Sequence, residues 1–448
     1  MLQEKKSKRS TLVVLLCTVA LLALVIVLEN TMKPTHMLFT VLKKGAVYAV
    51  VASSMNLLNG FTGLFSLGQS GFMLLGAYTY AILTIPVADR ESVYYIYQGS
   101  AVKFSLPELF GGGAVGLVLG VLVALILAGV VAAAVAWLIG LPVLRLKSDY
   151  LAIATLGFGE IIRAVFQWDK LGPVTNGANA LKSFPTFSSF NIETAGGFSL
   201  RLSTFVPFFL GAICIGVILL LINSTYGRAF KAIRDDEVAA EAMGINLSRH
   251  KRLAFCISSF FAGVGGGLFA MFANQAQAKT FTTAMTYEIL LIVVIGGIGS
   301  ISGSCIAAFL YVAASEWWLR FLDTSVTFQS AADPKRIAFI AVYAIVVIGG
   351  AVLLILRDRK GENKRWKQIV TGVIAAALMV WLIWYVMGGS MTMPFLRNGF
   401  RMVVFSLVIM VVVLFFRRGL MGDRELADVG RSLWRRLSGK GKKKEVVK

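Results

Sequence analysis

Glu160 and Arg163 are charged residues inside a long apolar run, residues 149–168. Their spacing of three puts them one turn apart on the same face of a helix, where a carboxylate and a guanidinium can pair. Charges at membrane depth are costly and usually face the interior of a helix bundle. An ion pair that stabilises the bundle and a contact with a substrate or gate both fit this pattern, and the sequence leaves the two open.

The motifs of common enzyme classes are absent from the chain. No GxxxxGK[ST] phosphate loop, GxSxG elbow or HExxH motif occurs. Gly111, Gly113 and Gly116 spell GxGxxG, but they open an apolar run with no strand before it, which excludes a dinucleotide site. His36 and His250 lie far apart and no cysteines form CxxC, so we expect no metal, cofactor, disulfide or catalytic residue.

The composition predicts a membrane protein. Hydrophobic residues make up 57% of the 448 residues and charged residues 15%, below the level of soluble domains. The net charge is +21, but the basic residues mostly flank apolar runs, which favours a membrane over nucleic acid. A bilayer core requires roughly 20 apolar residues per helix. We therefore predict an all-α polytopic membrane helix bundle of about 11–12 hydrophobic segments, some re-entrant or broken. The runs lie near 11–29, 38–58, 68–85, 112–141, 149–168, 203–223, 252–273, 303–322, 336–356, 369–388 and 400–416, with a shorter run at 286–298 that either crosses or re-enters.

The basic residues also predict an orientation. With the N-terminus in the cytoplasm and the chain alternating through the segments, most Lys and Arg residues fall on the cytoplasmic side. Both termini are then cytoplasmic, and the polar loops 86–110 and 169–202 lie outside. The first run has no small-residue cleavage site after it, so we expect an uncleaved anchor. Lys43 and Lys44 lie inside the second run, and we expect them to snorkel to the outer interface.

A predicted cytoplasmic loop, residues 224–252, has the pattern of a short capped helix. Asp235 or Asp236 can cap its start, where acidic residues suit the positive end of the helix dipole. Gly244 can supply the left-handed residue that ends it. An ordinary cytoplasmic loop and a docking element for a partner both fit this helix.

The side chains of this helix favour docking. Alanines at 239, 240 and 242 let a partner backbone approach closely, while Met243 and Ile245 can fill a groove. The residues assigned to this loop are Arg234, Asp235, Asp236, Glu237, Ala239, Ala240 and Gly244.

Two glycine clusters interrupt the apolar pattern, one in each half of the chain. Unwound backbone at membrane depth is tolerated where protein or water satisfies it, and broken helices in both halves of a transporter mark the translocation path. Close helix packing through small residues is the alternative and requires no path. The candidates for the path are Gly60, Gly63, Gly68, Gln69, Gly71, Gly296, Gly297 and Gly299, together with Glu160 and Arg163.

Several separated motifs resemble one family. Val238-Ala239-Ala240, three residues and Gly244 resemble the EAA loop of ABC importer permeases, which docks on the ATPase subunit. The segments MNLLNGFTGLFSLGQ (55–69), DYLAIATLGFGEIIR (149–163), GGIGS (296–300) and FFRRGLMG (415–422) resemble the branched-chain amino acid ABC transporter permease family, LivM type. Val238 stands where the EAA pattern has Glu, and Ser304 where the family usually has Pro.

The resemblance implies a function and its partners. It implies the permease subunit of an ATP-driven importer of branched-chain or other hydrophobic amino acids in the bacterial inner membrane. A second related permease, two ATP-binding subunits and an extracytoplasmic binding protein would complete it, with ATP bound by the partner subunits. A family member that carries urea or short amides fits the same motifs. An ATP-independent secondary transporter or channel is the rival class, and it requires intramembrane acids of its own.

The same comparison suggests a division of the chain. Residues 1–37 form the N-terminus and first anchor, 38–331 the permease core, and 394–422 its last span. Residues 332–393 have no counterpart in the family and are predicted to be an inserted two-span hairpin. The basic tail, 423–448, fits either an amphipathic helix on anionic lipid or a disordered solubilising segment.

Overall fold

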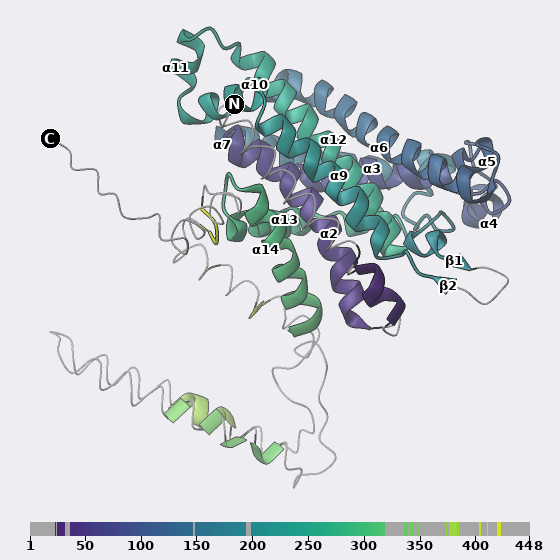
Figure 1. Cartoon of the computed structure of the whole chain (residues 1–448). Helices are drawn as coiled ribbons and strands as arrows, with labels where there is room; N and C mark the ends of the chain where they lie inside the picture. The colour runs from purple at the N-terminus through teal and green to yellow at the C-terminus, as the bar shows by residue number, and fades with distance from the viewer. Residues whose placement is uncertain are drawn as a thin grey trace, which may run out of the picture. The chain divides into compact units, whose positions relative to one another are not determined.

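The computed structural model describes residues 25–31, 36–146, 148–193 and 199–318, together with residue 23 and separate positions between 336 and 422 (Figure 1). Most of the predicted first run, most of the span at 400–416 and the whole basic tail lie outside the described residues. The chain divides into two compact units, Met1–Trp317 with Val408–Lys448 and Trp318–Leu407. The two units are described separately below.

Among the described residues, four helices are long and apolar enough to cross a membrane. The first joins α2 to the π-helix η1, and a fifth span is formed if the bent pair of α7 and the segment after it is counted as one. The prediction of a helical, multi-pass membrane protein is therefore confirmed. These elements are α2 (Met37–Asn56), η1 (Leu57–Phe61), α6 (Gly113–Val143), α9 (Phe205–Ile222), α12 (Leu247–Ala273) and α7 (Ser148–Phe166), the last bent by 62° from η3 (Asp169–Leu171) and α8 (Gly172–Thr175).

Three apolar helices are shorter than a bilayer requires. They are α3 (Gln69–Thr84), α13 (Thr283–Gly296) and α14 (Ile301–Ala313), which continues into the π-helix η6 (Ala314–Trp318). At 16 residues, α3 is about 24 Å long against a hydrocarbon core of about 30 Å. The helices α3 and α14 lie at the predicted runs 68–85 and 303–322, and α14 continues as η6 up to the last described residue of the second run.

The unwound segment before α3 is stabilised by side chains. Ser66 N donates to Asn59 Oδ1 at 3.2 Å, and Leu67 N donates to Thr155 Oγ1 at 2.9 Å. These bonds replace the helical ones that a backbone at membrane depth would otherwise lack.

Helix α12 is the centre of the first unit. It packs against α6, α3 and α2, and α2 in turn packs against α14 and α9. The approach of α3 to α12 is close because Gly76 lies against Gly263: a Cβ added at Gly76 would lie 1.9 Å from the Gly263 carbonyl oxygen. Over the most apolar 18 residues of each helix, 78% of α12 is buried but only 28% of α9, so α9 is peripheral and exposes apolar side chains.

Small elements gather at one end of this unit, and the hydrophilic helices α10 and α11 lie at the other (Figure 1). The small elements are α4 (Arg90–Val93), η2 (Tyr95–Tyr97), α5 (Leu106–Leu109), η4 (Phe187–Phe190) and the antiparallel strands β1 (Ile192–Glu193) and β2 (Ser199–Leu200). Tyr94 donates its hydroxyl to the Val174 carbonyl at 2.9 Å, which joins loops 86–110 and 169–202. Both loops thus lie at one end, as the predicted alternation of spans requires.

Buried Arg90 stabilises the first of these loops. Its guanidinium donates to the carbonyl oxygens of Ile82, Val102 and Phe104 at 2.8, 2.9 and 2.6 Å. Burial lowers the pKa of this guanidinium, and the carbonyl oxygens replace the water that it loses.

Lys43 and Lys44, which are predicted to snorkel to the outer interface, each have a partner within the protein. Lys43 Nζ donates to Ser203 Oγ at 2.5 Å, and the same hydroxyl donates to buried Glu29 at 2.5 Å. Lys44 forms an ion pair with Glu316. Partners from distant parts of the chain satisfy both ammonium groups inside the protein, so neither has to reach water.

The second unit is described at separate positions only. The rings of Tyr343 and Trp381 lie 5.9 Å apart, so the segments around these two residues are in contact. The inserted hairpin at 332–393 stays a prediction.

Candidate functional site

The hydrophilic end of the first unit carries an elbow, residues 225–246, made of α10 (Thr225–Asp235) and α11 (Glu237–Ala242). Asp236 Oδ1 accepts from Val238 N at 2.9 Å and from Ala239 N at 3.0 Å, which caps α11. Gly244 has a φ of 85° and ends the helix in the left-handed region. The predicted capped helix and its glycine stop are confirmed, with Asp236 as the cap.

The elbow presents apolar side chains to its surroundings. Val238 is 78% exposed and Met243 is 84% exposed, and Ala239 is exposed beside them. Large apolar side chains exposed on a charged helix mark an interaction surface. Ala240 is only 4% exposed, so its predicted accessibility to a partner is wrong.

Ala240 is buried because the elbow folds back on its own chain. Ile245 N donates to the Ala240 carbonyl at 3.1 Å, and Lys251 Nζ on α12 pairs with Glu237 Oε2 at 2.6 Å. The face of α11 that carries Ala240 therefore packs against the rest of the chain, and the opposite face is exposed.

The elbow contacts the first glycine cluster directly. Arg234 Nη1 donates to the Gly60 carbonyl at 3.1 Å, and Asp235 Oδ1 accepts from the same guanidinium at 3.1 Å. Gly63, with a φ of 74°, lies under the Arg234 stem, and a Cβ there would be 3.1 Å from Arg234 Cγ. Lys231 Nζ lies 5.5 Å from the centre of the Phe61 ring, a second contact between α10 and η1.

The remaining glycines of the first cluster serve close packing. A Cβ at Gly68 would lie 2.9 Å from the Thr155 carbonyl oxygen, and one at Gly71 would lie 2.8 Å from Gly159 Cα. Gln69 Nε2 donates to Ser54 Oγ at 2.6 Å. These contacts support the packing interpretation for the start of α3.

The second glycine cluster forms the turn between α13 and α14. Gly297 and Gly299 have φ values of 113° and 94°, which glycine adopts without strain. Gly296 packs against Gly303, and a Cβ at Gly296 would lie 2.6 Å from the Gly303 carbonyl carbon. Gly296 also accepts from Met421 N at 3.2 Å, so the motif at 415–422 reaches this turn.

Asn56 brings the two clusters together. Its side chain is fully buried, and its oxygen accepts from Gly299 N at 2.9 Å. Its amide nitrogen donates to the Ser300 carbonyl at 2.9 Å and to Ser304 Oγ at 2.8 Å. Sequence reasoning did not assign this residue, although a polar amide inside the apolar run 38–58 is the signal that could have found it.

The segment from Ala276 to Gly299 connects the two ends of the bundle. Ala276 pairs with Leu181 in the loop cluster, and Gly299 lies against Gly60 beside the elbow. The predicted run at 286–298 lies in this segment, with α13 as its helical part, and its crossing or re-entry stays a prediction.

Comparison with known proteins identifies the family of this chain. Residues 37–337, more than half of the chain, match the family model described as branched-chain amino acid transport system / permease component. The chain belongs to this family of transport permeases. No solved structure matches it.

The permease is similar to three curated relatives. The LivM proteins of Salmonella typhimurium and Escherichia coli, described as high-affinity branched-chain amino acid transport system permease proteins, are each 33% identical over 300 residues. The match covers 62% of this chain and 63% of each relative, so it spans less than two thirds of their length. A probable LivH permease of Methanocaldococcus jannaschii is 27% identical, over 52% of this chain and 71% of the relative.

The predicted pair of Glu160 and Arg163 in the permease is confirmed. Arg163 Nε donates to Glu160 Oε2 at 2.7 Å along α7. Both side chains are about one-third exposed, so the pair lies on the surface of this subunit rather than in the centre of the bundle. The neighbouring Gly159 packs against Gly71, and the pair contacts neither the elbow nor the turn between α13 and α14 through any bond in the described part of the chain.

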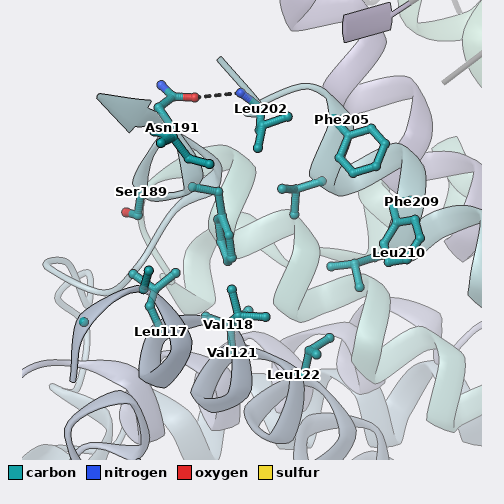
Figure 2. A pocket seen from close by; sticks show the side chains of 15 residues that line it. Leu117, Val118, Val121, Leu122, Ser189, Asn191, Leu202, Phe205, Phe209 and Leu210 are labelled. Carbon is teal, nitrogen blue, oxygen red and sulfur yellow. Dashed lines mark hydrogen bonds between the residues drawn. The ribbon is translucent and has the colours of Figure 1, made fainter. Parts of the chain in front are cut away.

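The permease also has an apolar groove of about 520 Å³ between α6 and α9 (Figure 2). Leu117, Val121, Phe205 and Phe209 line it, and its lining includes no charged side chain. Its polar side chains are Ser189 and Asn191, and the Asn191 oxygen already accepts from Leu202 N at 3.1 Å, so the lining offers no charged partner for the ammonium and carboxylate of a free amino acid. The described residues also contain no cluster of three metal-ligating side chains.

Proposed function

We propose that this permease is a membrane-spanning subunit of an ATP-driven ABC importer. The observation that carries the proposal is the elbow: a capped helix with Val238 and Met243 exposed, whose base is hydrogen bonded to a glycine break among the membrane helices. The chain has no phosphate loop, so nucleotide would be bound and hydrolysed by two separate ATP-binding subunits. With α11 bound in a groove of an ATP-binding subunit, a movement of that subunit would displace α11.

The proposed orientation follows from this docking. With the elbow in the cytoplasm of a bacterial cell, loops 86–110 and 169–202 face outward, where an extracytoplasmic binding protein would deliver the solute. Both termini are then cytoplasmic, as the basic residues predict. A second related permease would complete the pore, and the similarity to LivM and LivH proteins supports such a pair.

The proposed cargo is a branched-chain or other hydrophobic amino acid. The names of the LivM relatives and of the family support this class. The permease does not require a tight substrate site for selectivity, because the binding protein can supply it.

The test is capture of the ATP-binding subunit on the purified permease. The Ala239→Trp variant places a bulky ring on the free face of α11, and we expect it to abolish capture and labelled-leucine uptake. Ala101→Trp, at an alanine that is also exposed but lies at the opposite end, is the matched control and should leave capture unchanged. Full capture by Ala239→Trp, or loss of capture in both variants, would refute docking at the elbow.

A further inference from the structure

Asn56 uses both ends of its amide to join α2 to the turn between α13 and α14. The oxygen accepts from Gly299 N, and the nitrogen donates to Ser300 and Ser304 and, at 3.3 Å, to the Gly297 carbonyl. These bonds fix the buried amide in one rotamer, since rotation of the amide would leave the buried Gly299 N–H without the acceptor it has here. The C-terminal end of α2 and the turn between α13 and α14 therefore form one rigid unit.

The backbone contact between the two glycine clusters reinforces this connection. A Cβ at Gly60 would lie 2.6 Å from Gly299 N and 1.9 Å from Asn56 Oδ1. Only glycine leaves room for the Asn56 side chain to reach Gly299 across the π-helix. π-Helical turns often lie at functional sites, and this one brings a carbonyl to the elbow.

The elbow contacts this rigid unit at the Gly60 carbonyl. Arg234 donates to it, and Asp235 fixes the guanidinium from the other side. A charge-assisted hydrogen bond is about twice as strong as a neutral one. A continuous chain of contacts thus connects α11 with the turn at 297–300, through Arg234, Gly60 and Asn56.

We propose that Arg234 and Asn56 are positioning residues that make the two glycine breaks move together with the elbow. Displacement of α11 pulls η1 through Arg234, and Asn56 carries the turn at 297–300 with it. Both broken helices then change together, so the importer has one gate movement for each movement of its ATP-binding subunits. This inference rests on the proposed function, which supplies the displacement.

The first test measures coupling in the complete importer in vesicles. Asn56→Leu keeps the size of the side chain and removes its hydrogen bonds, and because the side chain is fully buried it cannot itself contact an ATP-binding subunit. We expect the ATP-binding subunit to be captured as by the wild type, while labelled leucine taken up per ATP hydrolysed falls about tenfold. An uptake-to-hydrolysis ratio within twofold of the wild type would overturn the inference. Failure of the wild-type chain to capture the subunit would instead overturn the proposed function.

The second test does not depend on how well Asn56→Leu folds. Spin labels on Thr225→Cys and Ile298→Cys, both exposed positions outside α11, report the distance between the elbow and the turn in a chain without its native cysteines. In the complete importer this distance should be the same with and without trapped ATP, because the two sites move together. In the Arg234→Met background it should change by about 2 Å, the size of a typical helix shift.

Arg228→Met is the matched control for this second test. Arg228 is exposed on the same helix α10, and its loss removes the same charge. It should preserve the constant distance of the wild type. A distance that changes in the wild type, or that stays constant in Arg234→Met, would overturn the proposed connection.

Discussion

Gly60→Ala tests whether the first glycine cluster is required for packing. The added methyl carbon would lie 1.9 Å from Asn56 Oδ1 and 2.6 Å from Gly299 N, whereas ordinary contact begins at 3.4 Å. The Asn56 amide must rotate away, and the turn that carries Gly299 must shift. Because both neighbours are fully buried, neither can move into solvent.

The expected cost has two parts. Overpacking of a dense interior costs about 1–3 kcal/mol. Loss of the acceptor for Gly299 N leaves a buried donor unsatisfied, which costs about 1–3 kcal/mol more. Gly216→Ala on α9 is the control, since a Cβ there meets nothing within 4 Å. Relief of glycine entropy should make that variant about 0.5–1 kcal/mol more stable.

The assay is the free energy of unfolding of the purified permease in mixed micelles, followed by tryptophan fluorescence. We expect Gly60→Ala to lie below Gly216→Ala by roughly 3 kcal/mol or more. Equal stability of the two variants would refute the packing argument. Loss of uptake by Gly60→Ala without loss of stability would instead favour a role in lining the path.

Two further predictions concern local contacts. Asp236→Ala removes the cap of α11 and should cost that helix about 1 kcal/mol, which lowers capture of the ATP-binding subunit; Asp236→Asn keeps the accepting oxygen and should restore capture. Arg163→Gln leaves the Glu160 carboxylate without its partner and should lower the yield of folded permease. The double variant with Glu160→Gln should recover both yield and uptake, and a folded double variant without uptake would assign the pair a transport role.

Local patterns explain why part of this protein could be predicted. The length of an apolar run decides whether a helix can cross a membrane, and α6, α9 and α12 lie where their runs predict. A cap and a left-handed glycine act within one helix, so Gly244 and a cap at Asp235 or Asp236 could be predicted from their spacing, and the structure shows that the cap is Asp236. The spacing of Glu160 and Arg163 identified their pair for the same reason.

Features that depend on distant partners could not be predicted in this way. Lys44 lies inside an apolar run, and its partner Glu316 is 272 positions away. Ala240 looks like its neighbour Ala239, but only contact with the rest of the permease decides which of the two is buried.

The amino-acid sequence by itself determined that this chain is a helical membrane protein with a capped helix on one loop, because run length, capping and turn residues act over a few positions. The tertiary structure decided which glycines pack and which turn. It also placed Asn56 between the two glycine breaks and Arg234 between the elbow and the first of them. Hydrogen bonds across more than 170 positions, such as that from Arg234 to Gly60, depend on how the helices pack, and no spacing in the sequence encodes that arrangement.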